Sequence, residues 1–478
     1  MTKRAIWWIR RDLRLDDNPA LLEAARAEAM LAVYVHAPEE EEPWPLGGAQ
    51  RWWLDRSLAS LAASLAARGS RLVVLRGEAA KVLSDLSRAL GVSSVVWSRR
   101  FEPAARRQES RVEAALDALG VRWHAYLSNH LTDPEEIATQ TGNPYQVYTP
   151  FARNVRARPA PGRPREAPAA LPPADGAPGG VAIAELGLAP TIDWDAGLRE
   201  TWAPGEAGAR AHLARFTAGP IAAYPEGRDV PSIEGTSRLS PHLAFGEIGI
   251  RRVWHAASGA SPATSVDKFH AELLWREFAT HVLFHFGHTD LAPLRPEYAR
   301  FPWRDDRAAL EAWRRGRTGY PLVDAGMREL WRTGWMHNRV RMVVASFLVK
   351  HLLLPWQEGA KWFWETLVDA DLASNSLGWQ WAAGSGADAA PYFRIFNPTS
   401  QAAKFDPDGA YIRRWVTELA ALDAKSAREP AEAAPLTLLA SNVRLGENYP
   451  RPIVAHAMAR ERALAALAAV TAGKRGTP

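Results

Sequence analysis

The chain has 478 residues, which exceeds the usual size of one hydrophobic core and favours two domains. It contains no cysteine, so disulfides, thiolate zinc sites, cysteine-ligated iron–sulfur clusters and cysteine nucleophiles are excluded. A formal net charge of +5 permits a polyanionic partner without requiring one. No apolar run approaches the roughly 18 residues of a membrane span, and charge follows the amino terminus too early for a signal peptide. We therefore expect a soluble cytoplasmic protein with no membrane partner.

Residues 1–130 alternate short β-branched or aromatic runs with amphipathic segments. The predicted strands are Ala5–Ile9, Leu31–His36, Arg71–Leu75, Ser94–Trp97 and Val121–Tyr126, and the clearest helical periodicity covers Gln50–Arg68 and Pro103–Leu119. This alternation predicts an α/β domain with a parallel sheet and flanking helices. No GxGxxG follows the first strand, so the domain is expected to be Rossmann-like in shape only.

The remainder of the chain divides into a linker, residues 131–205, and a helical domain, residues 206–478. The linker is dense in Pro, Ala and Gly over 157–192, a composition that cannot bury a core and indicates an extended connector. Periodicity of i, i+3, i+4 predicts helices over 207–217, 264–286, 307–315, 321–333, 335–353 and 357–368. These helices predict an all-helical carboxyl-terminal domain.

Two helical segments place unusual residues on one face. Within 335–350, Asn338, Arg341 and Met342 are neighbours at i, i+3 and i+4. Within 272–278, Glu272, Trp275 and Arg276 have the same spacing, which would set a stacking indole between a carboxylate and a guanidinium. Taken alone, the segment 335–350 is better explained as a core helix with a capping Asn and solvated arginines. The segment 272–278 could also be a surface Arg–Glu pair beside a buried Trp.

Two further stretches combine polar groups with small residues. In 368–398, Asp369 and Asp371 precede Asn375, and glycines allow a close approach of backbone to a ligand. The glycine and glutamate spacing of a calcium loop is missing, so no metal site is predicted. In 234–248, hydroxyl residues surround Arg238 before a predicted helix N-cap at Ser240, an arrangement typical of phosphate binding.

Eight strings occur in one order along nearly the whole chain: RRDLRLDDNPAL, TGNPYQVYTPFAR, EGTSRLSPHLAFGEI, ELLWREF, GYPLVDAGMREL, TGWMHNRVRM, DADLASNSLGWQWAAGSGADAAPYFRIFNP and YPRPIV. Together they closely resemble the photolyase/cryptochrome family, and most of all the bacterial photolyases that repair cyclobutane pyrimidine dimers. Chance does not explain why several long strings agree with the family in the same order.

The resemblance implies FAD bound in the helical domain. The residues it assigns to FAD are Tyr224, Thr236, Ser237, Arg238, Leu239, Ser240, Phe269, Arg276, Trp335, Asn338, Arg341, Asp369, Asp371 and Asn375. An Arg341–Asp369 ion pair would tune the flavin's charge, and Asn375 would face the flavin N5, where a neutral amide suits a reduced, anionic flavin. Phe269 stands where some bacterial members have Trp.

The resemblance also implies a light-driven activity on DNA that contains cyclobutane pyrimidine dimers. An electron would pass from photoexcited reduced FAD to a flipped-out dimer, with Glu272, Asn338 and Asn375 as catalytic residues. The residues assigned to DNA and substrate are Arg228, Glu272, Trp275, Asn338, Arg339, Met342 and Trp381. A flipped dimer is two rings with polar edges, which fits an apolar wedge, a hydrogen-bonding carboxyl and a basic rim.

The same residues distinguish among the relatives. Enzymes that repair (6-4) photoproducts carry two histidines where this chain has Asn338 and Met342, which favours the cyclobutane dimer. No long tail follows Pro452, which disfavours a signalling cryptochrome with a carboxyl-terminal extension. A monomer is expected.

Electron supply and light harvesting complete what the resemblance implies. Trp379, Trp356 and Trp303 stand where the family keeps its photoreduction chain from flavin to surface. The stretch 43–61 resembles a chromophore-side segment of the family, and methenyltetrahydrofolate is favoured over a deazaflavin as antenna. Ala104 and Ala105 replace the Asn-Glu pair of the best-known folate-binding branch, which implies a different mode of binding.

Two other classes of function remain open at the level of sequence. One is a blue-light receptor of the cryptochrome type, which would bind FAD and signal without repairing DNA. The other is an electron-transfer flavoprotein that has no DNA partner. Repair of dimers in light would distinguish a repair enzyme from the receptor. Affinity for dimer-containing DNA would distinguish it from the electron-transfer flavoprotein.

Overall fold

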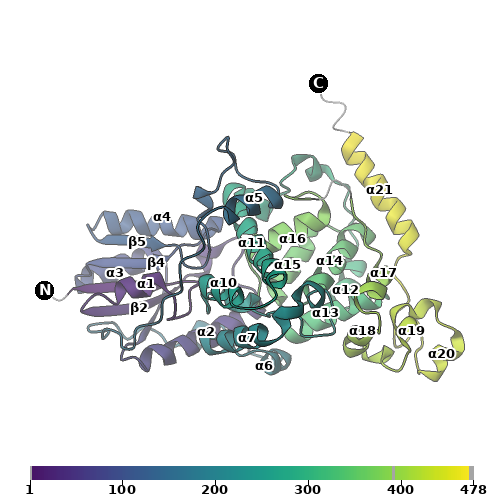
Figure 1. The fold of residues 1–478 in the computed structure, drawn as a ribbon, viewed down its shortest axis with the longest axis horizontal. Helices are drawn as coiled ribbons and strands as arrows, with labels where there is room; N and C mark the ends of the chain where they lie inside the picture. Colours follow the sequence, from purple (N-terminus) through teal and green to yellow (C-terminus); the bar gives the residue numbers. More distant parts are fainter. Residues whose placement is uncertain (1–2, 390–392, 473–478) are drawn as a thin grey trace. The chain divides into compact units, whose positions relative to one another are not determined.

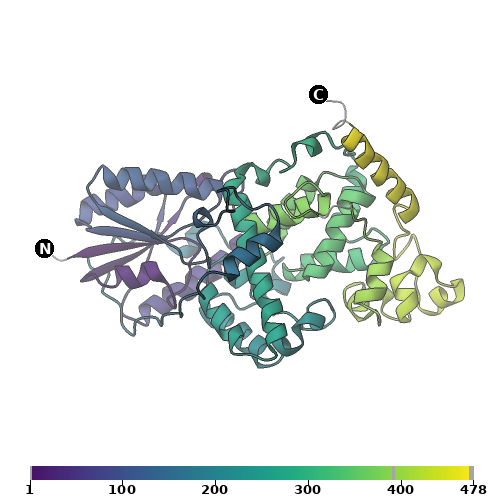
Figure 2. The same ribbon diagram turned by 45° about the horizontal axis from the view of Figure 1, so that its top comes forward.

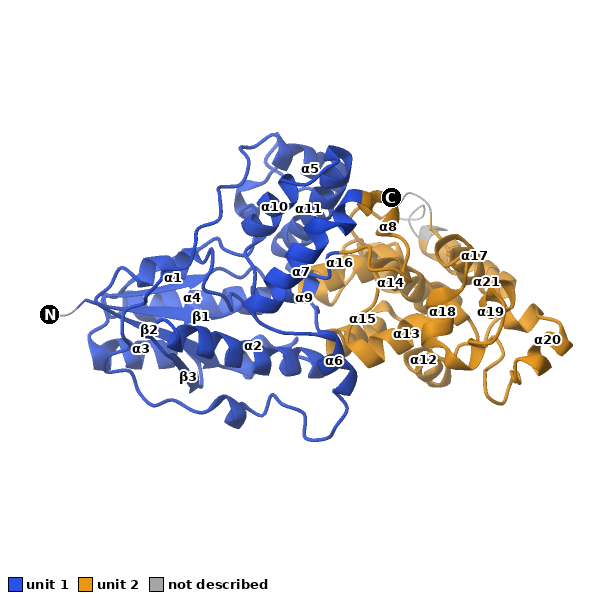
Figure 3. Cartoon of the chain, turned by 60° about the horizontal axis from the view of Figure 1, so that its bottom comes forward, with its two compact units in different colours: residues 1–222, 237–287, 368–371 blue, residues 223–236, 288–367, 372–478 orange. Residues whose placement is uncertain are grey.

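The computed structural model describes residues 3–389 and 393–472 of the chain (Figure 1). Contacts between Cα atoms divide it into two compact units, coloured separately in Figure 3. Unit 1 comprises residues 1–222, 237–287 and 368–371, and unit 2 comprises residues 223–236, 288–367 and 372–478. The predicted boundaries at residues 130 and 205 are not tested by this division and stay a prediction.

A five-stranded parallel sheet forms the centre of unit 1, as predicted. Its strands are β1 (Arg4–Ile9), β2 (Ala29–His36), β3 (Leu72–Arg76), β4 (Ser94–Ser98) and β5 (Arg122–Tyr126). They lie in the order β3-β2-β1-β4-β5, and Trp7 in the central strand pairs with Ala32 on one side and Val96 on the other. Parallel pairing demands crossover helices, and Figure 2 shows helices along both faces of the sheet.

The crossover helices bury the sheet because their apolar residues recur at helical spacing. They are α1 (Pro19–Ala24), α2 (Gly48–Ala66), α3 (Ala79–Leu90) and α4 (Pro103–Asp117). Helices α3 and α4 contribute Leu83, Leu86, Val112 and Leu116 to a core shared with Trp97 of β4. Periodicity in the sequence predicted α2 and α4, whereas it did not predict α1 or α3.

The longest helix of unit 1 is α11 (Ala263–His285). Unit 1 has further helices besides the crossovers and α11. They are α5 (Tyr148–Arg156), α6 (Ala196–Thr201), α7 (Glu206–Ala218), α9 (Ser240–Ala244) and α10 (Ile250–Ser258). Both α5 and α10 contact α11. Helices α7 and α11 agree with the predicted ranges to within one residue.

Unit 2 is helical, which confirms the predicted class of the carboxyl-terminal region. Its helices are α8 (Tyr224–Gly227), α12 (Arg307–Arg314), α13 (Pro321–Thr333), α14 (Asn338–Ser346), α15 (Trp356–Thr366), α16 (Leu372–Ala383), α17 (Pro398–Phe405), α18 (Ala410–Trp415), α19 (Ala424–Arg428), α20 (Pro435–Ala440) and α21 (His456–Ala472). Within the described ranges, no helix combines the length and apolar composition needed to cross a bilayer.

The helix predicted over 335–353 is wrong at both ends. Residues 335–337 lie outside it, because His337 has extended backbone and caps α14 through its side chain. The other end leaves the α-helical pattern at Phe347, where a π-helix runs to His351. Trp335 therefore precedes the helix that carries Asn338, instead of sharing its face.

Candidate functional site

The first turns of α14 display three residues predicted to contact substrate. The Nδ1 atom of His337 accepts a hydrogen bond from the backbone N–H of Arg339 at 3.2 Å, which fixes where the helix starts. Asn338 is exposed there, while Arg339 and Met342 are half-buried. A Cβ added to Gly326 of α13 would lie 2.4 Å from Val340, so that glycine lets α13 support α14 at close range.

Arg339 is held by an acid that the sequence analysis missed, Asp229. Its Nη2 atom donates to the Asp229 carboxylate at 2.7 Å, and its Nη1 atom lies 3.8 Å from the sulfur of Met342. The guanidinium also lies 4.3 Å from the ring centre of Phe405. Asp229 directly follows Arg228, whose Nε atom is 3.9 Å from the same carboxylate. Arg228, Arg339 and Met342 are therefore brought together within unit 2.

Two predicted flavin residues lie just before and within α14. Arg341 donates from Nε to the carbonyl of Met336 at 2.7 Å, and its guanidinium is 6.0 Å from the ring centre of Trp335. Trp335 is buried. The hydrogen bond holds Arg341 against the chain that enters the helix. The predicted Arg341–Asp369 pair joins residues assigned to different units and stays a prediction.

Helix α16 carries the predicted residues Asn375, Trp379 and Trp381. The Asn375 side chain donates from Nδ2 to the carbonyl of Ala360 in α15 at 3.0 Å, which fixes the orientation of its amide. Trp379 is buried, whereas Trp381 is partly exposed. Residues two positions apart on a helix point in nearly opposite directions. One helix thus separates a core tryptophan from one that can meet a ligand.

Trp379 packs edge-on against Phe363 at 5.0 Å and Trp313 at 6.1 Å between ring centres. The other two tryptophans of the predicted electron path also lie in unit 2. Trp356 is buried at the first position of α15, and Trp303 is half-buried with its ring 4.3 Å from that of Phe301. Of the three residues, two are buried and Trp303 is half-buried, and their role as an electron path stays a prediction.

Helix α11 of unit 1 holds Phe269, Glu272 and Trp275. The Trp275 ring stacks on Tyr148, with ring centres 3.8 Å apart and an interplanar angle of 7°. Glu272 lies 3.8 Å from Lys268, one helical turn earlier, and its side chain is 26% exposed. Phe269 is buried against Phe216 of α7. Tyr148 was missed as a partner of Trp275, although it lies in the quoted string TGNPYQVYTPFAR.

Arg276 does not simply share the exposed face of Glu272 and Trp275. Its Nη1 atom donates to the backbone carbonyl of Asn129 at 2.6 Å, and its side chain is 16% exposed. The carbonyl belongs to the segment that follows β5. Part of this guanidinium therefore anchors α11, and its predicted role toward FAD stays untested.

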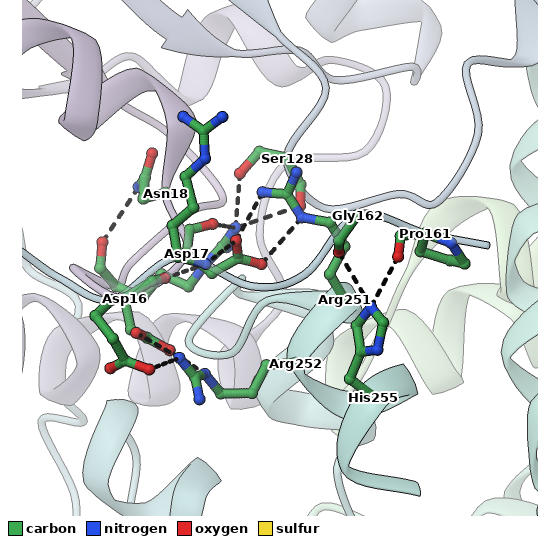
Figure 4. A network of polar contacts seen from close by, with 12 residues as sticks. Asp16, Asp17, Asn18, Ser128, Pro161, Gly162, Arg251, Arg252 and His255 are labelled. Carbon is green, nitrogen blue, oxygen red and sulfur yellow. Dashed lines mark hydrogen bonds and ion pairs between the residues drawn. The ribbon is translucent and has the colours of Figure 1, made fainter. Parts of the chain in front are cut away.

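The amino-terminal string RRDLRLDDNPAL accounts for that anchor. Arg14 is fully buried and donates to the side chains of Asn129 at 2.7 Å and Ser128 at 2.6 Å. Figure 4 shows the surrounding network, in which Asp17 accepts from Arg251 at 2.8 Å, and Arg252 reaches Asp16. The string thus has a structural role: it locks the loop that presents the Asn129 carbonyl to α11.

The hydroxyl-rich segment adopts a backbone suited to an anion. Arg238 has a positive φ of 52°, and Leu239 follows at φ −85°, ψ −6°. This alternation turns successive N–H groups toward one concavity, as in anion-binding nests. The cap at Ser240 was predicted one residue too late, because Leu239 is the N-cap and Ser240 already begins α9. The backbone N–H groups of this turn and the hydroxyl of Ser237 are donors that fit a phosphate group.

The peptide between the two aspartates is held by Gln50, a residue of the sheet domain that carried no prediction. Its Nε2 atom donates to the carbonyl of Ala370 at 2.6 Å, and its Oε1 atom accepts from the N–H of Gly47 at 3.1 Å. Gln50 is fully buried in the first turn of α2. The bond pins the short segment 368–371 in unit 1, so Asp369, which is buried, and Asp371 flank a fixed peptide.

Electrostatics around His337 keep this imidazole neutral. Burial lowers the pKa of His337 to about 4; the carboxylate of Asp229 opposes the shift, and Arg339, Arg341 and Arg228 add to it. Three guanidinium groups thus act on one buried ring in unit 2. These guanidinium groups make the surface at the first turn of α14 positively charged, which suits a polyanionic partner.

Comparisons with known proteins show the family to which the chain is related. The family model for the FAD binding domain of DNA photolyase matches residues 269–469, and the DNA photolyase model matches residues 5–173. A deoxyribodipyrimidine photo-lyase from Agrobacterium fabrum is 47% identical over 98% of each chain. Cryptochrome-1 from Arabidopsis thaliana is 38% identical over 94% of this chain and 68% of its own length.

Solved structures give the same result. The crystal structure of a bacterial class III photolyase from Agrobacterium tumefaciens superposes with a TM-score of 0.95 at 46% identity, covering 98% of both chains. A cryptochrome from Synechocystis gives a TM-score of 0.88 at 30% identity, over 97% of this chain and 99% of its own. The chain belongs to the photolyase/cryptochrome family, and its carboxyl-terminal half is the FAD-binding domain of that family.

Proposed function

We propose that the protein is a deoxyribodipyrimidine photolyase, which splits cyclobutane pyrimidine dimers in DNA when it is illuminated. The observation that carries the proposal is the first turn of α14, where exposed Asn338 stands beside Arg339 and Met342. It is supported by identity of 47% to a deoxyribodipyrimidine photo-lyase from end to end. An amide, a thioether and a guanidinium suit two apolar rings with polar edges and a phosphate backbone.

We propose that FAD is the cofactor of this chain. The anion nest at Arg238 and Leu239, with the neighbouring hydroxyls of Thr236, Ser237 and Ser240, would hold its phosphates. We place Tyr224 and Arg276 near these phosphates and Phe269 on a wall of the site. Around the ring system and ribose we place Trp335, Asn338, Arg341, Asp369, Asp371 and Asn375. Bound FAD, when reduced and excited by light, supplies the electron on which dimer cleavage depends.

The chain's own residues bind and orient the lesion. Trp275 and Trp381 offer apolar faces, Glu272 and Asn338 hydrogen-bond the polar edges of the bases, and Arg228 contacts the backbone. Trp275 is preorganised for this task, because its stack on Tyr148 fixes the plane of the indole. A dimer stacks and pairs poorly in the duplex, so its extrusion costs less than that of an intact pair.

Repair in light is the decisive experiment for this function. Purified protein with reduced FAD, incubated with dimer-containing DNA under near-UV or blue light, is expected to restore intact pyrimidines, and a dark sample is expected to leave them dimerised. Failure under illumination, despite reduced FAD, would favour a cryptochrome-type receptor and overturn the proposal.

A substitution at Glu272 tests the substrate assignment. Glu272→Ala is expected to keep FAD and to weaken binding of dimer-containing DNA about tenfold, the cost of one hydrogen bond to a charged group. Lys268→Ala is the matched control, because it removes the same intrahelical ion pair and leaves the carboxylate. Equal affinity of wild type and Glu272→Ala would reject Glu272 as a substrate residue.

Trp379, Trp356 and Trp303 form the proposed path for reducing the flavin. Trp379→Phe or Trp303→Phe is expected to slow photoreduction, measured by flavin absorbance under continuous light, because Phe is harder to oxidise. Repair by enzyme reduced chemically beforehand should be largely unchanged. Equal loss of photoreduction and of repair by pre-reduced enzyme would contradict the relay.

A second chromophore is also part of the proposal. We place methenyltetrahydrofolate near the segment 43–61, most of which forms α2 and its entry. Its identity is tested by an absorption spectrum of the purified protein and by identification of the released chromophores, and a deazaflavin would overturn it. We further propose that the chain divides into three parts at residues 130 and 205. We also propose that it is a monomer, which gel filtration tests.

A further inference from the structure

Asp229 lies beside two arginines that the proposed function assigns to DNA. Its Oδ1 atom is 2.7 Å from Nη2 of Arg339 and 3.9 Å from Nε of Arg228. The Arg339 side chain is 21% exposed and that of Asp229 is 32% exposed, so solvent and salt reach the pair. The contact is therefore too weak to be explained as a major source of fold stability.

The same place carries an excess of positive charge. Arg228, Arg339 and Arg341 all act on the buried ring of His337, and Asp229 is the acid that opposes them there. Glu329, whose carboxylate accepts from the backbone N–H of His337 at 3.3 Å, is buried and also accepts from the hydroxyl of Tyr411 at 2.7 Å. Asp229 is partly exposed and lowers the positive charge at this surface. Glu329 is buried and hydrogen-bonded inside the unit.

Arg339 also has donor capacity left over. Among the described residues, its Nε atom is buried without a hydrogen-bond partner, while one amino group contacts Asp229 and the other faces the sulfur of Met342. The buried Nε atom is out of reach of a phosphate, so the amino group beside Met342 is the donor that a phosphate would engage in a charge-assisted contact. The guanidinium is held in place by a carboxylate that a phosphate can replace or share.

We propose that Asp229 is a positioning residue that orients Arg339 and, by its negative charge, restrains binding of undamaged DNA at the first turn of α14. Binding without a lesion rests almost entirely on electrostatic contact with phosphates. A carboxylate next to the phosphate-binding arginines opposes that contact. A dimer gains further contacts at Asn338 and Met342, so its binding tolerates the carboxylate better. This inference rests on the proposed function.

The test separates charge from geometry by means of Asp229→Asn, which removes the charge and keeps an oxygen for Arg339. Affinity for undamaged duplex DNA is expected to rise about fivefold at low salt, the upper range for an exposed charge pair. The plot of log affinity against log salt should steepen by about 0.9, the value for one more neutralised phosphate. The preference for dimer-containing DNA should fall, because the dimer complex gains less.

Glu358→Gln is the matched control. It removes an acid from the Arg314–Glu358 pair, which spans 3.1 Å and has similar exposure of 27% and 36%. It changes the net charge equally and lies on α15 of the same unit. An unchanged slope in this variant shows that a steeper slope in Asp229→Asn is local.

The possible results distinguish this inference from the proposed function. An unchanged salt slope in Asp229→Asn, with FAD content and melting temperature as in wild type, overturns the role of Asp229 even if wild type repairs dimers. A wild type without preference for dimer-containing DNA overturns the proposed function, while the slope on undamaged DNA still decides about Asp229. Lower affinity of Asp229→Asn for both DNAs at an unchanged slope would show that Asp229 is only structural.

Discussion

A single glycine, Gly359 of α15, determines how closely that helix approaches Trp379. A Cβ at this position would lie 2.0 Å from the indole, so Gly359→Ala must displace the ring. We expect it to lower the free energy of unfolding by about 1–3 kcal/mol, as overpacking does, and to slow flavin photoreduction. Denaturant unfolding and flavin absorbance under light measure the two effects.

Gly378 of α16 provides the control for that prediction. It precedes Trp379 directly, yet an added Cβ there meets nothing within 4 Å. Gly378→Ala is therefore expected to be neutral or to stabilise the helix by roughly 0.5–1 kcal/mol. Equal unfolding midpoints of the two alanine variants would show that contact with the indole is not what requires glycine at 359.

At this scale the sequence predicts which residues matter better than what they touch. Trp275, Arg276 and Asn338 were assigned because they stand in long recognisable strings. The partners of Trp275 and Arg276, which are Tyr148 and the Asn129 carbonyl, come from distant parts of unit 1 and have ordinary residue types. The same is true of Gln50, which bonds the Ala370 carbonyl beside Asp369. Side-chain partnership across more than a hundred residues depends on the folded backbone, and no local spacing encodes it.

At the scale of the elements, composition predicts that the proline-rich segment 157–192 is an extended connector. All of it is described, and a 3-10 turn is its only regular element. It is nevertheless packed within unit 1: the N–H of Leu171 donates to the carbonyl of Arg68, and that of Val181 donates to the carbonyl of Val74 in the edge strand β3. The segment covers the free edge of the sheet, which composition could not predict.

Gly180 allows the segment to pair with that edge. It has a φ of +73°, and an added Cβ would lie 2.6 Å from the carbonyl oxygen of Val74. Gly180→Ala is expected to cost about 1–3 kcal/mol locally and to make the segment more sensitive to limited proteolysis. Gly179→Ala is the control, since nothing lies within 4 Å of its added Cβ. The same cleavage rate in both variants would reject edge pairing as the source of protection.

Helices were predicted where one face carries a long apolar repeat, as in α7, α11 and α13. They were missed where a short helix is held by its neighbours, as in α1, or where both faces are occupied. Helix α16 is such a case, because Trp379 packs inward while Asn375 bonds to α15. A helix that packs on both sides has no simple apolar periodicity, which is why α16 was not predicted.

For the molecule as a whole, stability should fall in mild acid because buried histidines are neutral in the fold. Burial lowers the pKa of His212 and His337 to about 4, and of His281 and His351 to about 3. Each would titrate near 6.5 when unfolded. Between pH 6.5 and about 4 the unfolded chain therefore binds more protons, and the free energy of unfolding decreases as pH falls. Above pH 6.5 these groups give no pH dependence.

His281 allows this effect to be isolated. Its Nε2 atom accepts from the N–H of Tyr145 at 2.9 Å, so protonation there would break the bond. His281→Gln keeps an acceptor and cannot titrate, and it should reduce the pH dependence by up to about 1.4 kcal/mol per pH unit below 6.5. Urea midpoints at pH 7, 6 and 5 measure it. Phe151→Leu, which alters the ring 5.2 Å away, should lower stability equally at each pH. Parallel pH profiles for wild type and His281→Gln would exclude His281 as a source of the acid sensitivity.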